Sequence, residues 1–300
     1  SGGCGYTSAR NMQGTAAANA TACELAATGD LQRMKTLDHT SLYQADKHGA
    51  LPIHWAAGSG HMAALRYLID EIGMDAESEG QPPTKRAAQQ SKRRRPLHYA
   101  ARNGHLAIVR LLCEELGVDP DARARHSVSP FQLAVWQNQL DVATYLVEER
   151  GVDPMQVNCF ACGAQHWLGT APKERAGTDG ESLIPMARWL RGHGLDWLAP
   201  QRQGHRPLHK ASWGGHLQLC RWLRDECGAL DDVQVAGRGF KQCRCKRRRR
   251  IWGRGGGQGC SQQQVWSRPA PWKQPAKRGA REPLCVCVWL HALPEGSSWL

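Results

Sequence analysis

The clearest alternation of polar and apolar positions lies between residues 46 and 77. A polar turn, Asp46-Lys47-His48-Gly49, precedes Pro52 and a short apolar segment that ends in Gly58-Ser59-Gly60. Glycine supplies the positive φ that tight turns need, and proline suits the first turn of a helix because its missing N–H would have no partner there. A second apolar series follows at helical spacing, comprising Leu65, Leu68, Ile69 and Ile72. The pattern predicts two short helices, the first to about residue 58 and the second from His61.

This pattern recurs along the chain. The phrase Pro-Leu-His-x-Ala, or a close variant of it, stands at residues 52–57, 96–101, 130–134, 164–167 and 207–211. A second polar marker follows four of these phrases, at His61, His105, Gln139 and His216. The steps from His54 to His98, Gln132, His166 and His209 are 44, 34, 34 and 43 residues. A period of this size is typical of stacked helix pairs, because one pair cannot bury its own apolar face.

The repeat predicts an all-α solenoid of about six helix-turn-helix units with short turn fingers. Thr21 and Glu24 fit a capping box that opens a degenerate first unit. The units are expected within a domain over 22–232, at about 22–44, 45–77, 90–122, 123–155, 156–197 and 198–231. Insertions at 78–92 and 171–182 are polar and are expected to be surface loops. Residues 1–21 are expected to be disordered, and 233–300 form a low-complexity basic tail.

The units resemble ankyrin repeats. They share the Asp-x-x-Gly turn, the Pro-Leu-His-x-Ala-Ala phrase, the Gly-His pair, an apolar helix and a closing Gly-x-Asp. The resemblance covers about 22–232, and its many Trp residues are similar to those of large ankyrin families in some protists and algae. It implies a protein–protein interaction module or scaffold. The sequence departs from the family at Gln132 and Gln139, where His is replaced, and at Ala164, which lacks the starting Pro; we expect those two units to be less stable.

The resemblance implies a structural role for the repeated Pro and His residues, whose hydrogen bonds would join each turn to its neighbours. These signature residues are Pro52, His54, His61, Pro96, His98, His105, His166, Pro207, His209 and His216. Metal binding by the first four of these His residues is the weaker alternative, because residues repeated in register form rows and do not converge. No metal or other cofactor is expected.

The resemblance also implies a binding surface on a concave face, built from the turn tips and the exposed ends of the first helices. The matching positions are Lys47, His48, Lys92, Arg102, Asn103, Arg125, His126, Trp136, Gln137, Arg202 and Trp213. Four of the five tips carry a cation, and the two Trp residues are expected to be exposed, where Trp and Arg are frequent anchors of binding. We predict a protein partner with an acidic surface. The alternative is that the tips are simply polar and solvated.

The excess charge lies outside the repeats. Residues 233–300 contain 14 Lys and Arg against 2 acids, which accounts for the whole net charge of +12. Lys246 to Arg250 and the Gly-rich stretch 253–257 favour an alternative function, in which the tail binds nucleic acid. No repeat pattern continues after Asp232, and the alternating Cys and Val at 285–288 are what a GT-dinucleotide tract encodes. Three interpretations stay open for the tail: a gene-model artefact, a disordered basic tail, and a nucleic-acid-binding segment.

The 12 cysteines do not form a disulfide framework. Cys113, Cys220 and Cys227 fall within second helices, where a free Cys acts as a small apolar residue. A reducing, intracellular compartment is therefore expected, cytoplasmic or nuclear and not secreted. Cys159 and Cys162 have zinc-like spacing, but no second pair stands at a matching distance, so structural use is the preferred interpretation.

Membrane and catalytic functions have no support in the sequence. The longest apolar stretch, 284–293, is about half of the roughly 20 residues that cross a bilayer. We expect a soluble monomer with no membrane partner. The chain has no GxxxxGK[ST] phosphate loop, no HExxH and no nucleophile elbow, so an enzyme is not expected.

Overall fold

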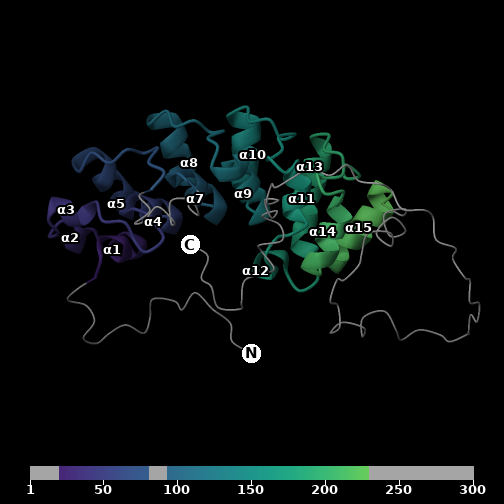
Figure 1. The fold of residues 1–300 in the computed structure, drawn as a ribbon, viewed down its shortest axis with the longest axis horizontal. Coiled ribbons are helices and arrows are strands. Elements are labelled where there is room, and N and C mark those ends of the chain that lie inside the picture. The colour runs from purple at the N-terminus through teal and green to yellow at the C-terminus, as the bar shows by residue number, and fades with distance from the viewer. Residues whose placement is uncertain (1–19, 81–92, 230–300) are drawn as a thin grey trace, which may run out of the picture. The chain divides into compact units, whose positions relative to one another are not determined.

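The computed structural model of the 300-residue chain describes residues 20–80 and 93–229. The predicted all-α fold is confirmed, because every regular element of these residues is a helix (Figure 1). All of them belong to one compact unit. The expected N-terminal segment up to residue 19, most of the 78–92 insertion and the basic tail lie outside the described residues.

The first unit begins as predicted. Helix α1 (Ala22–Thr28) is opened by Thr21, whose Oγ1 accepts the Glu24 N–H at 3.3 Å, while Glu24 Oε2 accepts the Thr21 N–H at 2.8 Å. The predicted capping box is therefore confirmed. Two short helices follow, α2 (Leu31–Met34) and α3 (His39–Leu42), each with an Asp side chain capping its N-terminus.

Five helix pairs follow, and four of their first helices begin at the predicted Pro. The first helices are α4 (Pro52–Ser59), α7 (Pro96–Asn103), α9 (Pro130–Trp136), α11 (Ala164–Leu168) and α14 (Pro207–Gly214). The second helices are α5 (Met62–Arg66) with η2 (Tyr67–Glu71), α8 (Leu106–Arg110) with η3 (Leu111–Glu115), α10 (Leu140–Thr144) with η5 (Tyr145–Glu149), α13 (Ile184–Gly192) and α15 (Leu217–Cys227). The segments η2, η3 and η5 are π-helical continuations of the helices before them.

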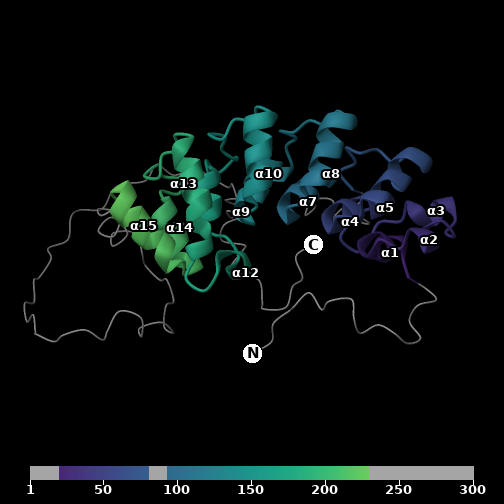
Figure 2. The same ribbon diagram turned by 180° about the vertical axis from the view of Figure 1, so that it is seen from behind.

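The core runs continuously between these pairs, because the first helices α4, α7, α9, α11 and α14 pack on one another in chain order (Figures 1 and 2). Alanines at 0% exposure let the first helices approach closely. The second helices place a fully buried Leu at the same position, seven residues after the polar marker: Leu68, Leu112, Leu146 and Leu223. Truncating such a Leu to Ala costs about 2–5 kcal/mol, so each interface between units contributes strongly to stability.

The insertion at 171–182 differs from the expected surface loop. It contains a short helix, α12 (Lys173–Ala176), and leads into a 3₁₀ turn, η6 (Glu181–Leu183). Ala176 and Leu183 are fully buried. The segment packs because Ala171, Ala176 and the adjoining Leu183 enter the core between α11 and α13.

Among the described residues, no helix combines the length and the apolar character that crossing a bilayer requires.

Candidate interaction surface

The connections between units form short hairpin turns, which we call fingers. In the finger over Asp46–Ala50, the Asp46 N–H donates to the Ala50 carbonyl at 2.9 Å, and Asp46 Oδ1 accepts the His48 N–H at 2.7 Å. Gly49 has a φ of 85°, which closes the turn. Lys47 and His48 are therefore held at an exposed tip.

Three further fingers are joined side by side through their backbones. They span 124–128, 158–162 and 201–205, and each is closed by a hydrogen bond between its end residues. The Cys159 N–H donates to the His126 carbonyl at 3.1 Å, and the Arg202 N–H donates to the Phe160 carbonyl at 2.9 Å. These bonds bring Arg125, His126 and Arg202 onto one edge; Arg125 and Arg202 are exposed and His126 is half-buried. Lys92, the remaining predicted tip, lies outside the described residues.

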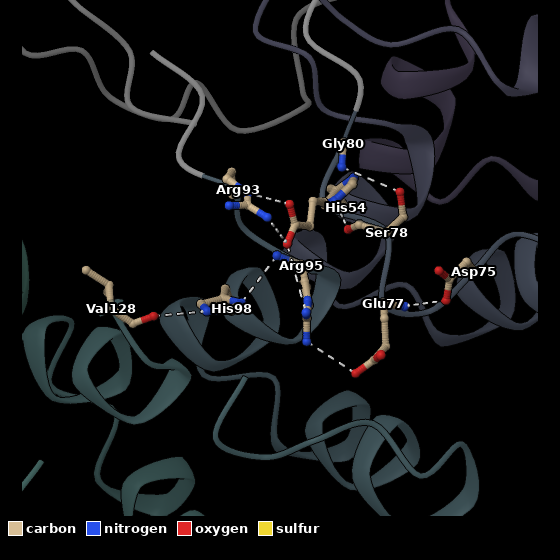
Figure 3. Close-up of polar contacts among 10 residues, drawn as sticks. His54, Asp75, Glu77, Ser78, Gly80, Arg93, Arg95, His98 and Val128 are labelled. Atoms are coloured by element: carbon tan, nitrogen blue, oxygen red, sulfur yellow. Dashed lines mark hydrogen bonds and ion pairs between the residues drawn. The ribbon is translucent and has the colours of Figure 1, made fainter. Parts of the chain in front are cut away.

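One row of signature residues caps the first helices, and two of these residues, His54 and His98, also join their helix to the next connection. The Nδ1 atom of His54 accepts the Leu51 N–H at 3.0 Å, and its Nε2 atom donates to the Ser78 carbonyl at 2.9 Å. His98 makes the same pair of bonds, from the Arg95 N–H at 3.2 Å and to the Val128 carbonyl at 3.3 Å (Figure 3). His166 and His209 accept the corresponding N–H groups, at 3.3 and 3.0 Å. Burial lowers the pKa of His98 to about 3, which keeps it neutral.

The unit with Gln in place of His makes equivalent bonds. Gln132 Oε1 accepts the Ser129 N–H at 3.4 Å, and Gln132 Nε2 donates to the carbonyls of Gln156 and Cys162 at 3.3 and 3.4 Å. The Ser129 hydroxyl accepts the Gln132 N–H at 3.2 Å and adds a cap that the His units lack. An amide has the same donor and acceptor as a neutral imidazole, so the replacement keeps the connection.

A second row of polar markers reaches back to the preceding unit. The ring of His105 donates to the Gly58 carbonyl at 3.0 Å, and His61 and His216 bond the carbonyls of Ala27 and Ala171 at the same distance. Gly60 ends the preceding helix at a φ of 85°, and a Cβ there would lie 2.7 Å from His105 Nδ1. The glycine is thus required both by its backbone conformation and by the close approach of the His ring.

The predicted exposure of Trp136 is wrong. Only 8% of Trp136 is exposed, and its Nε1 donates to the Thr170 carbonyl at 2.9 Å. Its ring also packs against Trp167, with centroids 6.5 Å apart. The physical reason is the packing of neighbouring units, because Thr170 and Trp167 of the next unit and Arg102 of the preceding unit lie against the indole. Gln137, also predicted on this surface, is likewise 8% exposed.

The other predicted first-helix positions are half-buried. The guanidinium of Arg102 lies over the Trp136 ring, 5.5 Å from its centroid. The Asn103 side-chain amide donates to the Gly58 carbonyl and so joins two units. Trp213 is half-buried at the end of α14, beside the ring of His205 at 4.7 Å between centroids. We call the finger tips and these ends of the first helices the finger surface.

Cations are distributed unequally between the two sides of the stack. On the second helices, ion pairs join four of the five steps between units: Lys35–Glu71 at 3.2 Å, Arg66–Glu115 at 2.6 Å, Arg110–Glu149 at 2.5 Å and Arg188–Glu226 at 3.2 Å. At the remaining step, His193 Nε2 lies 3.4 Å from Glu148 Oε1. On the finger surface, no carboxylate of residues 20–80 or 93–229 forms an ion pair with Lys47 or Arg202. These two exposed cations therefore carry positive charge that the described carboxylates do not pair with.

The base of the 81–92 insertion is held by ion pairs. Arg93 Nε lies 2.6 Å from Glu79 Oε2, and Arg95 Nη1 lies 3.3 Å from Glu77 Oε1 (Figure 3). Arg95 also reaches Glu79 at 3.9 Å. A Cβ on Gly80 would lie 2.4 Å from the Gly49 carbonyl oxygen, so the start of the insertion runs against the preceding finger. These contacts fix where both ends of the insertion leave the finger surface.

The two cysteines with zinc-like spacing lie in different surroundings. Cys159 Sγ is 3.7 Å from His126 Nδ1 at the finger edge, whereas Cys162 is 1% exposed. Burial raises the pKa of the Cys159 thiol, although the nearby Arg202 opposes the shift. Within the described ranges, no group of three or more His, Cys, Asp or Glu side chains converges as metal ligands would.

One charged residue close to the finger surface was missed by sequence reasoning. Lys210 occupies the variable position of the Pro-Leu-His-x-Ala phrase in α14, where it is fully buried. The signal was present in the aligned repeats, because the same position holds Trp55, Tyr99, Leu133 and Trp167 in the other units. A lysine in a row of large apolar residues marks that unit as different.

Comparison with known proteins agrees with this geometry. Sequence models of ankyrin repeats match residues 20–124 and 87–158 in a three-copy form, and residues 184–224 in a many-copy form. No curated protein matches the chain significantly. A solved structure described as the Bd0816 predatory endopeptidase from Bdellovibrio bacteriovorus in complex with immunity protein Bd3460 has a similar fold, with a TM-score of 0.51 and 17% identity. That match covers 69% of this chain and 98% of the other, and at this identity it shows the fold alone.

Proposed function

Because this chain belongs to the ankyrin-repeat family, we propose that it is a protein–protein interaction module or scaffold that binds an acidic protein on its finger surface. Ankyrin repeats generally mediate contacts between proteins, and the family is typically non-enzymatic. The repeats offer the partner a row of fingers, three of them linked through their backbones, with cations at several of the tips.

The unequal distribution of ion pairs carries this proposal. Four of the five steps between second helices have an ion pair between a Lys or Arg and a Glu, so the cations at those steps are paired. No carboxylate of residues 20–80 or 93–229 forms an ion pair with Lys47 or Arg202, although both are exposed on fingers closed by backbone hydrogen bonds. Complementary charge steers a partner and fixes its orientation, so an acidic surface fits the finger side better than the second-helix side.

The fingers also limit the cost of binding. Backbone bonds from Cys159 to His126 and from Arg202 to Phe160 hold three tips in place before a partner arrives. A surface that is already ordered loses less conformational entropy on binding than mobile loops do. Half-buried Trp213 supplies an aromatic anchor at one end of the row.

Charge removal on each side of the stack tests the proposal. The full chain would be compared with a finger variant, Lys47→Gln with Arg202→Gln, and a matched control, Lys35→Gln with Arg188→Gln. Both variants lose the same charge and keep the basic tail, so the tail contributes equally to both. Titration with a fluorescent oligoglutamate peptide should show binding weakened on the order of tenfold in the finger variant, about 0.7 kcal/mol for each exposed cation. Equal affinities of the two variants would contradict the proposal.

A further inference from the structure

A fully buried lysine lies within the sixth unit. Lys210 stands in α14 and is 0% exposed, in contrast to the cations at the finger tips. Its Cβ packs against Gly169, where an added Cβ would approach it to 2.8 Å. The side chain therefore lies in the interface between the fifth and sixth units, where the other units place aromatic or aliphatic residues.

The ammonium group of Lys210 has no hydrogen-bond acceptor among the described residues. Its Nζ lies over the ring of Trp213, 4.6 Å from the ring centroid. The His205 ring packs edge-on against that Trp at 4.7 Å. Asp196 lies in the same region, but its Oδ1 accepts the Leu198 N–H at 2.8 Å and forms no ion pair with the lysine.

An ammonium in these surroundings is costly for the free chain. Burying a charged group without a partner is strongly unfavourable, and the attraction of an aromatic face offsets only part of that free energy. A Leu at the equivalent position of the fourth unit, Leu133, fills the site without that cost. Stability of the stack alone therefore gives no reason for a lysine here.

We propose that Lys210, with Trp213 and His205, forms an anchoring subsite for one Asp or Glu side chain of the acidic partner. The inference rests on the proposed function and names the residue at which that partner is held most strongly. The ammonium would donate to the incoming carboxylate, and the half-buried Trp213 ring would pack on the aliphatic part of the same side chain. The Trp213 ring lies over the ammonium and is itself half-buried, so rotation of this side chain would open a path from the surface to Lys210.

The charge balance of the subsite selects a carboxylate. Burial, followed by the charge of Lys210, lowers the pKa values of His166 and His205 to about 4, so both rings are neutral near pH 7. Lys210 is then the charged group of the cluster, and one positive charge matches one carboxylate. A phosphate group carries close to two negative charges and is bound by several charged donors, which this cluster does not supply.

Replacement of the lysine by an apolar residue of the same length separates the two effects. Lys210→Met should raise the melting temperature of the free full chain, because it removes an ammonium without an acceptor. The same variant should bind the oligoglutamate peptide on the order of tenfold more weakly than the wild type. Lys35→Met is the matched control, since it removes an equal charge from the second-helix side. Lys210→Leu, which copies the fourth unit, repeats the test if the Met variant does not fold.

The outcomes distinguish this inference from the proposed function. A melting temperature that falls in both variants would show that Lys210 serves packing, and peptide binding unchanged by both would show that no carboxylate reaches it. Either result overturns the subsite, while the finger variant described above still decides the proposed function. A wild-type chain that does not bind the peptide at all overturns both.

Discussion

At the scale of single residues, neutral imidazoles join the units. His54, His98 and His166 each use Nδ1 as an acceptor for a backbone N–H three residues earlier, so the proton must sit on Nε2. Burial lowers the pKa of all three, to about 3 for His98 and about 4 for His166. Protonation would remove the acceptor and place a charge inside the stack. The stability of the folded chain should therefore depend on pH through these buried His residues.

Acid should destabilise the chain well above the pH at which its carboxylates titrate. A His in an unfolded chain has a pKa of about 6.5, which is above the folded values, so the unfolded state takes up protons first as the pH falls. Stability is thus fully present above about pH 6.5 and is lost as the pH falls toward about 3–4, at up to about 1.4 kcal/mol per pH unit for each such His. The urea midpoint, measured between about pH 7 and pH 4, checks this.

The fourth unit supplies the control for that measurement. Gln132 makes the same connections with an amide that does not titrate, so His98→Gln should keep the bonds and flatten the pH dependence of the midpoint. An unchanged slope in the variant would mean that groups other than this His carry the effect. A wild-type midpoint that stays constant from about pH 7 to pH 4 would contradict the role of the whole row.

At the scale of elements, the 171–182 insertion is part of the folded stack. Asn138 has a φ of 57°, and its side-chain amide donates to the Ser182 carbonyl at 2.8 Å and the Arg175 carbonyl at 3.4 Å. On the other side, the Gln218 N–H donates to the Asp179 carbonyl at 2.8 Å. The insertion is thus held by the fourth and sixth units, and it covers the end of α9.

Loss of the Asn138 side chain should loosen this insertion. Asn138→Gly keeps the positive φ without strain, so its effect isolates the two side-chain bonds, worth about 1–2 kcal/mol together. Trypsin should cleave after Lys173 and Arg175 about tenfold faster than in the wild type, because the open state is more populated. Cleavage after Lys35, far along the stack, serves as the internal control. Equal rates in the two proteins would show that other contacts hold the insertion.

The positions of helices could be predicted from sequence because their signals are local. Pro at the start and Gly at the end of a first helix act within a few residues, and Thr21 with Glu24 formed the predicted cap. The burial of Trp136 could not be predicted, because it depends on contacts with Thr170 and Trp167 of the next unit. The burial of Lys210 could not be predicted either, because it arises from the packing of one unit on the next. The finger tips that carry cations could be identified from the sequence. Which of these cations form an ion pair could not, because ion pairs depend on contacts between units.

At the scale of the whole molecule, charge is organised in two ways. Ion pairs neutralise the second-helix side of the repeats, and the net charge of +12 belongs to residues 233–300. We propose that the acidic partner binds the finger surface and not the tail. The contributions of the finger surface and of the tail to binding can be separated by neutralising one and keeping the other.

Neutralising the tail should leave binding at the fingers intact. Replacing Lys246 and Arg247–Arg250 by Gln removes the main basic cluster of the tail. Binding of single-stranded RNA, if carried by the tail, would fall steeply with salt and disappear in this variant. When the finger variant and its control both carry the neutralised tail, the finger variant should still bind the oligoglutamate peptide more weakly than the control. Loss of that difference would assign the acidic peptide to the tail.

The most direct test of the finger surface is site-resolved. Carbodiimide coupling of the oligoglutamate peptide to the full chain forms an amide only where a peptide carboxylate rests against a lysine, and mass spectrometry identifies the lysine. Lys47, exposed on a finger, and Lys35, paired with Glu71 on the second-helix side, are both partly exposed and provide an internal comparison. The account predicts that Lys47 couples well above Lys35, and that excess salt or the Lys47→Gln with Arg202→Gln variant removes the finger-side products. Coupling at Lys35 equal to or greater than coupling at Lys47 would contradict it.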